Sequence, residues 1–216
     1  MKKTLNILLA FFLFLFVICL SVVITLNFTA LYDMTVDTKS LSSTYNISEE
    51  IISNNYNTLV RYNSIFSNFK LEFDSLSMSE QGAIHFYEVR NIFVGIQILL
   101  GVSFFACLFG IIKKLKSKDY KFLLYSAIMT ISVPLVLGAF VMSNWSWSFT
   151  TFHKIFFRND YWIFNPATDP IILFLPDNFF FACAILIISL IFIFIAIMLL
   201  LYFKSKKRET YLTKFY

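Results

Sequence analysis

Charged residues are scarce in this chain of 216 residues: Asp, Glu, Lys and Arg make up 14% of it, whereas hydrophobic residues make up 58%. In an ordinary soluble domain about a quarter of the residues are charged. Four long segments contain no charged residue at all, namely 7–28, 92–112, 122–142 and 179–203. Each is close to or above the roughly 20 residues with which a helix crosses a bilayer, and a helix satisfies its own backbone polar groups in lipid. The sequence therefore predicts an all-α polytopic membrane protein with four transmembrane helices.

Several catalytic signatures are missing as well. The sequence has no G-x-S-x-G elbow, Walker loop, dinucleotide-binding fingerprint or H-E-x-x-H pair. Cys19, Cys107 and Cys183 all fall within apolar segments and lack C-x-x-C spacing, which argues against a disulfide framework or a zinc knuckle. The absence of charge from the apolar segments also argues against transport, because transporters usually place ionisable groups there. We expect no cofactor, and neither nucleic acid nor nucleotide as a partner.

Basic residues are distributed unevenly between the polar segments. With the N-terminus in the cytoplasm, most of the Lys and Arg residues lie inside, whereas Asp119 and Glu209 are the only acids there. The positive-inside rule therefore predicts that both termini are cytoplasmic. The first apolar segment is longer than the core of a usual signal peptide, and residues 22–27 offer no small-x-small cleavage site. We interpret this segment as a retained anchor.

The two remaining polar segments would lie outside the cell, which gives eight predicted regions. They are a first span at 1–28, an extracytoplasmic cap at 29–91 whose last helix is continuous with the second span at 92–112, a basic cytoplasmic loop at 113–121, a third span at 122–142, an aromatic interfacial loop at 143–178, a fourth span at 179–203 and a basic cytoplasmic tail at 204–216.

The cap segment carries helix signals and two weaker strand signals. Residues 46–49 read as a capped helix start, and apolar residues then recur at helical spacing, which predicts an amphipathic helix over about 47–66. Residues 34–37 and 70–74 alternate polar and apolar side chains, so two short strands are an open option. The capping-box pattern at 77–80 predicts a helix that runs unbroken into the second span.

The two histidines of the chain, His85 and His153, both fall outside the apolar segments. They could simply be interfacial side chains bonded to headgroups or loop carbonyls. Alternatively, the fold brings them together, and the two imidazoles supply a general base and a hydrogen-bond donor near neutral pH. Glu88 lies one helical turn after His85 and could orient it. Asp160, Asp169 and Arg158 lie near His153, either as part of the site or as residues of a charged turn. With an acid, the pair could also hold zinc.

The aromatic loop carries a more specific pattern. It reads Phe152-His153-Lys154-Ile155-Phe156-Phe157, then Trp162-x-Phe164-Asn165-Pro166-x-Thr168-Asp169-Pro170, and is preceded in the chain by His85-x-x-Glu88-Val89-Arg90. With four spans at this spacing and two histidines, the chain resembles the lipoprotein intramolecular transacylase family over essentially its whole length. The acid at the position of Glu88 is more often Asp in that family, which affects only the fine geometry.

The resemblance implies an acyltransferase that acts on bacterial lipoproteins. Its substrate would be a diacylated lipoprotein, and the reaction would move the sn-2 acyl chain of the diacylglyceryl group onto the α-amine of the N-terminal Cys, giving the lyso form. Donor and acceptor belong to one molecule, so no acyl-CoA or ATP is required. The partners would be this substrate and membrane lipids.

The same resemblance implies a site at the outer face of the bacterial plasma membrane. His85 and His153 would be catalytic, and which of them is the base stays open. The supporting residues would be Glu88, Arg90, Arg158, Trp162, Asn165 and Asp169, with no metal. The other readings are a non-enzymatic membrane sensor or assembly partner, and a metal-dependent membrane hydrolase.

Overall fold

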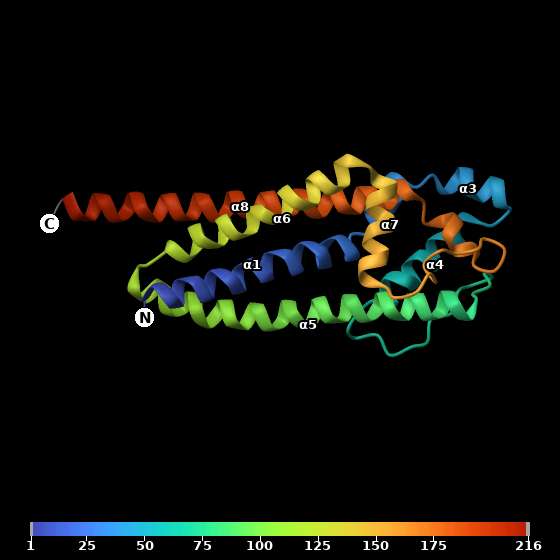
Figure 1. Cartoon of the computed structure of the whole chain (residues 1–216), viewed down its shortest axis with the longest axis horizontal. Coiled ribbons are helices and arrows are strands. Elements are labelled where there is room, and N and C mark those ends of the chain that lie inside the picture. The colour runs from blue at the N-terminus through green and yellow to red at the C-terminus, as the bar shows by residue number, and fades with distance from the viewer. Residues whose placement is uncertain (1, 215–216) are drawn as a thin grey trace. The chain divides into compact units, whose positions relative to one another are not determined.

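The structure is a computed structural model that describes residues 2–214. Its elements follow one another along the chain as seen in Figure 1. They are α1 (Lys2–Asn27), α2 (Ala30–Thr35), α3 (Thr38–Tyr45), α4 (Glu49–Tyr62), α5 (Glu80–Ser117), α6 (Lys121–Ser143), α7 (Trp145–Phe156), the 3-10 helix η1 (Pro170–Phe174) and α8 (Asp177–Lys214).

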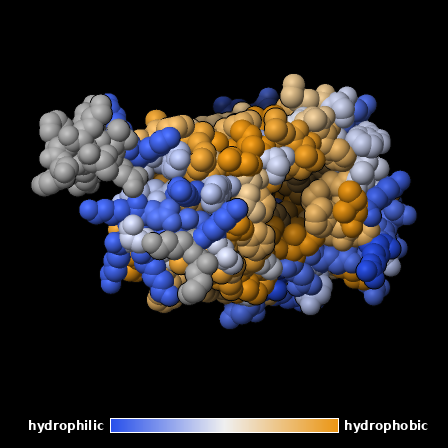
Figure 2. All heavy atoms as spheres, turned by 60° about the vertical axis from the view of Figure 1, so that its left-hand side comes forward, coloured by the Kyte–Doolittle hydropathy of each residue, from blue (hydrophilic) through white to orange (hydrophobic). Residues whose placement is uncertain are grey.

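Four of these helices are long and apolar enough to cross a membrane: α1, α5, α6 and α8. This confirms the four predicted spans. Large apolar side chains such as Phe105 and Phe109 on α5 are more than half exposed, and Figure 2 shows apolar side chains over much of the visible face. Lipid favours such a surface, whereas water does not. The second span is the end of one 38-residue helix, as predicted, but this helix begins at Glu80, with Ser79 and not Ser77 of the 77–80 pattern as its cap.

The chain forms two compact units. One of them contains the described residues of 2–22, 98–140 and 187–214, which are the larger parts of the four spanning helices. Its core is formed by Leu9, Val17, Cys107, Phe122, Leu123, Ala127, Ile191, Ile195 and Met198. A polar cluster joins helix ends in this unit: Asp119 accepts hydrogen bonds from Asn6 Nδ2 at 2.7 Å and from the buried Lys114 Nζ at 3.1 Å.

The other unit contains residues 23–97 and 141–186, and therefore both histidines. Its core is aromatic. The rings of Tyr32 and Tyr56 stack with their centroids 3.9 Å apart, and Phe179 meets both of them edge-on. The Tyr32 hydroxyl donates to the carbonyl of Phe174 at 2.8 Å, which ties α2 to η1. Burial raises the pKa of both tyrosines above the usual range, so both stay neutral. This core fixes the scaffold on which the site stands.

The amphipathic helix predicted at 47–66 is α4, which is shorter at both ends. Its cap is Ser48, whose hydroxyl accepts from the backbone N–H of Ile51 at 3.3 Å. Asn46, which the sequence suggested as the cap, instead ends α3 in a left-handed conformation with φ of 53°. Asn tolerates that conformation better than most residues.

No β-strand occurs among residues 2–214, so the two short strands suggested at 34–37 and 70–74 are wrong. The first stretch contains the end of α2, and the second is irregular. At Asp74 the side chain of buried Asn55 takes the place of a partner strand. Asn55 Nδ2 donates to the Asp74 carbonyl at 2.9 Å, and the Asp74 N–H donates to Asn55 Oδ1 at 2.7 Å. With these backbone groups already paired, no strand partner is needed.

Candidate active site

His85 is positioned by the first turns of α5. Ser79 caps this helix, because its hydroxyl accepts from the N–H of Gly82 at 2.9 Å. Asp169 Oδ1 accepts from the N–H of Ser79 at 2.7 Å, and Asp169 is only 2% exposed. A Cβ added to Gly82 would collide with the Asp169 carboxylate and touch Phe164. The absence of a side chain at Gly82 thus allows the 160s loop to lie directly against the start of the helix that carries His85.

His153 is carried by α7. Asn144 caps this helix by accepting from the N–H of Trp147 at 2.9 Å. Trp147, Phe152, Ile155 and Phe156 on α7 are exposed, whereas Ser148 is buried and His153 is half-buried. A short helix with Trp and Phe on its exposed surface suits the headgroup level of a bilayer. One helix can therefore present aromatic side chains to lipid and an imidazole to the protein.

The two imidazoles meet within this unit. Their ring centroids are 6.0 Å apart with 36° between the planes. His85 is only 5% exposed and lies between the rings of Phe157 and Phe164, at 4.7 and 5.5 Å. Trp162 stacks on His153 at 4.7 Å. Residues 68 positions apart in the chain thus form one pair inside an aromatic enclosure, which excludes the reading of two separate interfacial histidines.

The hydrogen bonding of His153 determines which of its nitrogens can act as a base. Nδ1 lies 2.7 Å from the carbonyl oxygen of Phe149. A carbonyl only accepts hydrogen bonds, so Nδ1 carries the hydrogen and the lone pair of the neutral ring is on Nε2. Burial lowers the pKa of His153 below its usual range, and the bond to Phe149 offsets part of that shift. The ring is therefore neutral at pH 7 and ready to take a proton.

Three buried polar atoms of this unit have no hydrogen-bond partner in the described part of the chain. They are Nδ1 of His85 itself, Nε1 of Trp162, which stacks on His153, and Oε2 of Glu88, which follows His85 by one helical turn. Leaving such an atom unpaired costs roughly 1–3 kcal/mol each. The indole nitrogen can only donate and the carboxylate oxygen can only accept. Trp162 and Glu88 therefore present an unused donor and an unused acceptor, which is the pattern expected of a site that binds a polar molecule.

Glu88 is bonded differently from what the sequence suggested. Its Oε1 accepts from Asn159 Nδ2 at 2.9 Å, and the structure gives it no hydrogen bond to His85. Asn159 Oδ1 in turn accepts from the N–H of Tyr161 at 3.1 Å. Asn159 is not singled out by the sequence, because an Asn next to Asp160 is typical of an ordinary turn. The residue in fact links α5 to the loop that carries Trp162.

The remaining supporting residues mostly shape the backbone. Arg90 donates from Nε to the Tyr62 carbonyl at 2.9 Å and from Nη2 to the Ser67 carbonyl at 2.7 Å, so it holds the turn after α4. Asn165 closes the turn before η1, with its carbonyl accepting from the N–H of Asp169 at 2.8 Å. Arg158 is exposed. Among the described residues no three His, Cys, Asp or Glu side chains group together in a way that could hold a metal ion.

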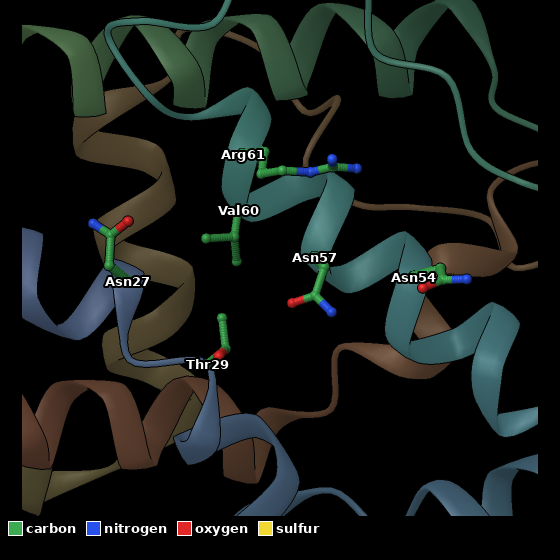
Figure 3. A pocket seen from close by; sticks show the side chains of 6 residues that line it. All are labelled: Asn27, Thr29, Asn54, Asn57, Val60 and Arg61. Atoms are coloured by element: carbon green, nitrogen blue, oxygen red, sulfur yellow. The ribbon is translucent and has the colours of Figure 1, made fainter.

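A polar cavity of about 680 Å³ lies between the end of α1 and one side of α4, and neither histidine lines it (Figure 3). Its walls are formed by Asn27, Thr29, Asn54, Asn57, Val60 and Arg61. The candidate site is therefore defined by the convergence of the two imidazoles and their unpaired neighbours, and is separate from this cavity.

Comparisons with known proteins point to one family. The family model described as "Lipoprotein intramolecular transacylase Lit" matches residues 7–180. The structure is similar to that of the membrane-integral lipoprotein intramolecular transacylase Lit from Bacillus cereus, with a TM-score of 0.93 and 32% sequence identity over 97% of this chain and 98% of that one.

Two further structures of the Bacillus cereus protein, with the H85R and the H85A mutation, both match with a TM-score of 0.86 and 32% identity. They cover 97% of this chain and 94% and 96% of their own chains respectively. A search of curated proteins found no match.

Proposed function

Because the chain belongs to the lipoprotein intramolecular transacylase family, and is therefore a membrane-integral acyltransferase acting on lipoproteins, we propose the reaction that its site carries out. The substrate is a diacylated lipoprotein, and the sn-2 acyl chain moves to the α-amine of its N-terminal Cys. The observation that carries this proposal is the pair formed by the buried His85 and the half-buried His153, with ring centroids 6.0 Å apart, in which His153 has a single free lone pair.

The reaction requires one proton to move from nitrogen to oxygen. His153 Nε2 takes a proton from the attacking amine as the new C–N bond forms. The C–O bond to the sn-2 oxygen of the glycerol then breaks, and the same ring returns the proton to that oxygen. One ester and one amine become one amide and one alcohol, so the mass does not change. General base and acid catalysis of this kind contributes typically about 10²–10⁴-fold to a rate.

The negative charge that develops on the ester oxygen needs donors. His85 lies across from His153, and Trp162 offers an indole N–H without a partner beside the same ring. We assign to these two groups the stabilisation of the tetrahedral intermediate. In an enclosure of aromatic rings such donors act at low local dielectric, where a charge-stabilising hydrogen bond is worth more than in water.

No second substrate is needed in this scheme. The amine and the ester belong to one lipid-linked cysteine, so binding turns the reaction into an intramolecular one, for which effective molarities of about 10⁵–10⁸ M are known. The exposed aromatic side chains of α7 would lie at the level where the acyl chains of the substrate leave the bilayer. The donor chain would therefore enter from the lipid side.

Orientation follows from charge. We assign the basic loop at 113–121 and the basic tail after 203 to the cytoplasm, and the unit containing both histidines to the extracytoplasmic side. A lipidated cysteine is anchored in the membrane by its acyl chains, which brings it to the depth of a site placed between α7 and the start of α5.

The orientation can be checked with single cysteines in a cysteine-free background. We expect a cysteine at exposed Lys39 to react with a membrane-impermeant maleimide in intact cells. A cysteine at exposed Lys116 should react only after the cells are opened. The reverse labelling pattern would place the histidines in the cytoplasm and contradict the assignment.

The reaction itself can be checked with the purified protein and a synthetic diacylated lipopeptide with a free N-terminal amine. We expect a product of unchanged mass whose amine no longer reacts with an amine label and whose fragmentation places one acyl chain on nitrogen. A chelator should have no effect. A product lighter by one acyl chain would indicate a hydrolase, and unchanged substrate under all conditions would favour a non-enzymatic partner.

A further inference from the structure

We propose that Glu88 and Asn159 form a binding site for a primary ammonium group, and that this site takes the α-amine of the substrate's N-terminal cysteine. The inference rests on the proposed function for the identity of the amine. Beyond that function, Glu88 Oε2 is the oxygen that binds the amine. Asn159 holds this oxygen in position. Neither residue takes part in moving the proton.

The carboxylate of Glu88 is half satisfied. Oε1 accepts from Asn159, whereas Oε2 is buried and has no partner among the described residues. Within the same residues no Lys or Arg forms an ion pair with Glu88. Glu88 itself is partly exposed, but its Oε2 is a buried carboxylate oxygen without a counter-charge, which is unfavourable. A cationic donor compensates such an oxygen better than a neutral one does. The protein thus leaves a place for a positive charge in the substrate.

Asn159 determines where that place lies. Its two amide ends are both engaged, with Nδ2 on Glu88 and Oδ1 on the N–H of Tyr161. The amide therefore cannot turn over without losing both bonds. It holds Oε1 of Glu88 on the side of the loop that leads to Trp162, and Oε2 is the oxygen that remains for a ligand. Asn159 is a positioning residue that acts through Glu88.

The ligand class follows from charge and geometry. Glu88 lies one helical turn after His85 on α5, so the two side chains project from the same side of the helix. An α-amine has an ordinary pKa of about 7.7–8.0 and is mostly protonated at pH 7. An alkylammonium has three N–H donors. One bonds to Glu88 Oε2 in the bound cation. The nitrogen of an ammonium has no lone pair, so it loses one proton to solvent water before it attacks. The neutral amine then keeps one N–H on Oε2 and turns the other toward His153 Nε2. A water molecule carries no charge and gains less from this carboxylate, which favours transfer to the amine over hydrolysis.

Binding measured without turnover tests the proposal. The inactive His153→Ala protein is titrated with two lipopeptides, one with the free α-amine and one in which hydrogen replaces the amine. We expect the aminated lipopeptide to bind at least about tenfold more tightly, as for a charge-assisted hydrogen bond in a buried site. Adding Glu88→Gln should reduce this preference to less than twofold. Adding Glu80→Gln, at an exposed acid on the first turn of the same helix, should leave it intact.

Kinetics of the active protein provide a second measurement if the double variants fold poorly. Glu88→Gln should raise KM for the lipopeptide by about tenfold while kcat falls less than threefold, and Glu88→Asp should recover part of the KM. A general loss of folding would lower the active fraction, and so kcat, without this split.

A mutant cycle tests the part played by Asn159. Asn159→Asp places a second carboxylate against Glu88 and should raise KM more than Asn159→Ala does. In a Glu88→Gln background the extra cost of Asn159→Asp should disappear, because the repulsion is gone. A merely structural Asn159 would show the same cost in both backgrounds.

The inference is overturned if the amine preference survives Glu88→Gln, or if no preference exists in the His153→Ala protein. It is independent of the proposed reaction in one direction: a wild-type protein that binds the aminated lipopeptide through Glu88 but forms no amide would contradict the reaction and leave the ammonium site standing.

Discussion

Replacing His153 with alanine should lower the rate of acyl transfer at saturating substrate by about 10³-fold, within the range known for a lost general base. The measurement is a single-turnover assay that follows the blocked amine of the lipopeptide. The side chain removed is the only group of the site with a lone pair assigned by its own hydrogen bond, because Nδ1 donates to the Phe149 carbonyl. Substrate binding should change little, since the bound ammonium keeps its bond to Glu88 Oε2 and loses only a contact with a neutral ring.

The matched control is Lys154→Ala, at the exposed neighbour on the same helix, which should retain near-normal activity. His153→Gln should be as inactive as His153→Ala, because an amide cannot serve as a base at neutral pH. A general base contributes at least roughly 10²-fold to the rate. If His153→Ala kept more than about a tenth of the activity, the proton would therefore have to move through another group.

The pH dependence of kcat in the wild-type protein also tests the assignment of His153 as the base. Burial depresses the pKa of His153, so the ring stays neutral to a lower pH than an ordinary imidazole does. The substrate α-amine itself gives kcat an acid limb near its ordinary pKa of about 7.7–8.0, and His153 should add a second, steeper limb below about pH 6.5, the usual value for histidine. If this second limb persisted in His153→Ala, another group would be titrating and the assignment to His153 would fail.

Replacing His85 with alanine should lower the rate by roughly 10²–10³-fold, the loss known for one missing oxyanion donor. The reason differs from that for His153, because His85 is assigned to donate to the ester oxygen. His85→Gln should therefore recover part of the rate, since its amide N–H can reach toward the same oxygen. The assay is again single turnover, with the folded state checked by thermal unfolding in detergent.

The contrast between the two glutamine variants separates the roles of the imidazoles. Partial activity in His85→Gln with none in His153→Gln supports His153 as the base and His85 as the hydrogen-bond donor. The opposite pattern would exchange the base and the donor while keeping the pair. Ile155→Ala on the exposed surface of α7 serves as a control for general disturbance of this helix and should retain near-normal activity, because its side chain is 70% exposed.

The membrane architecture could be predicted because it depends on segment composition alone. An uncharged segment of about 20 residues has few alternatives to a spanning helix, since lipid offers no partner to an open backbone. The turn between α5 and α6 falls in the basic segment that separates two apolar segments, as the same rule predicts. The long helix near Glu80 follows from the capping pattern at 77–80, although Ser79 provides the cap.

The small extracytoplasmic unit could be predicted only in part, because there the outcome depends on which partner satisfies each backbone group. The alternation at 70–74 is compatible with a strand, yet Asn55 pairs with both backbone groups of Asp74 from 19 residues away. A local sequence pattern does not indicate that a buried side-chain amide will pair with these backbone groups. The start of α4 is likewise not predictable from the local pattern. Asn46 ends α3 in a left-handed conformation, so Ser48 and not Asn46 is the N-cap of α4.

By itself, the sequence determined the class of protein, the four spans and the two residue types able to exchange a proton, because these depend on composition and on the short list of side chains that titrate near neutral pH. Only the tertiary structure decided that His85 and His153 face each other, that Phe149 assigns the tautomer of His153, and that Asn159 leaves one oxygen of Glu88 free. The physical reason is that the His85–His153 and Asn159–Glu88 contacts join residues far apart in the chain, so they arise from packing and not from local periodicity. The bond to Phe149 joins residues four apart on α7, but a side-chain conformation that makes it is not specified by the local sequence pattern.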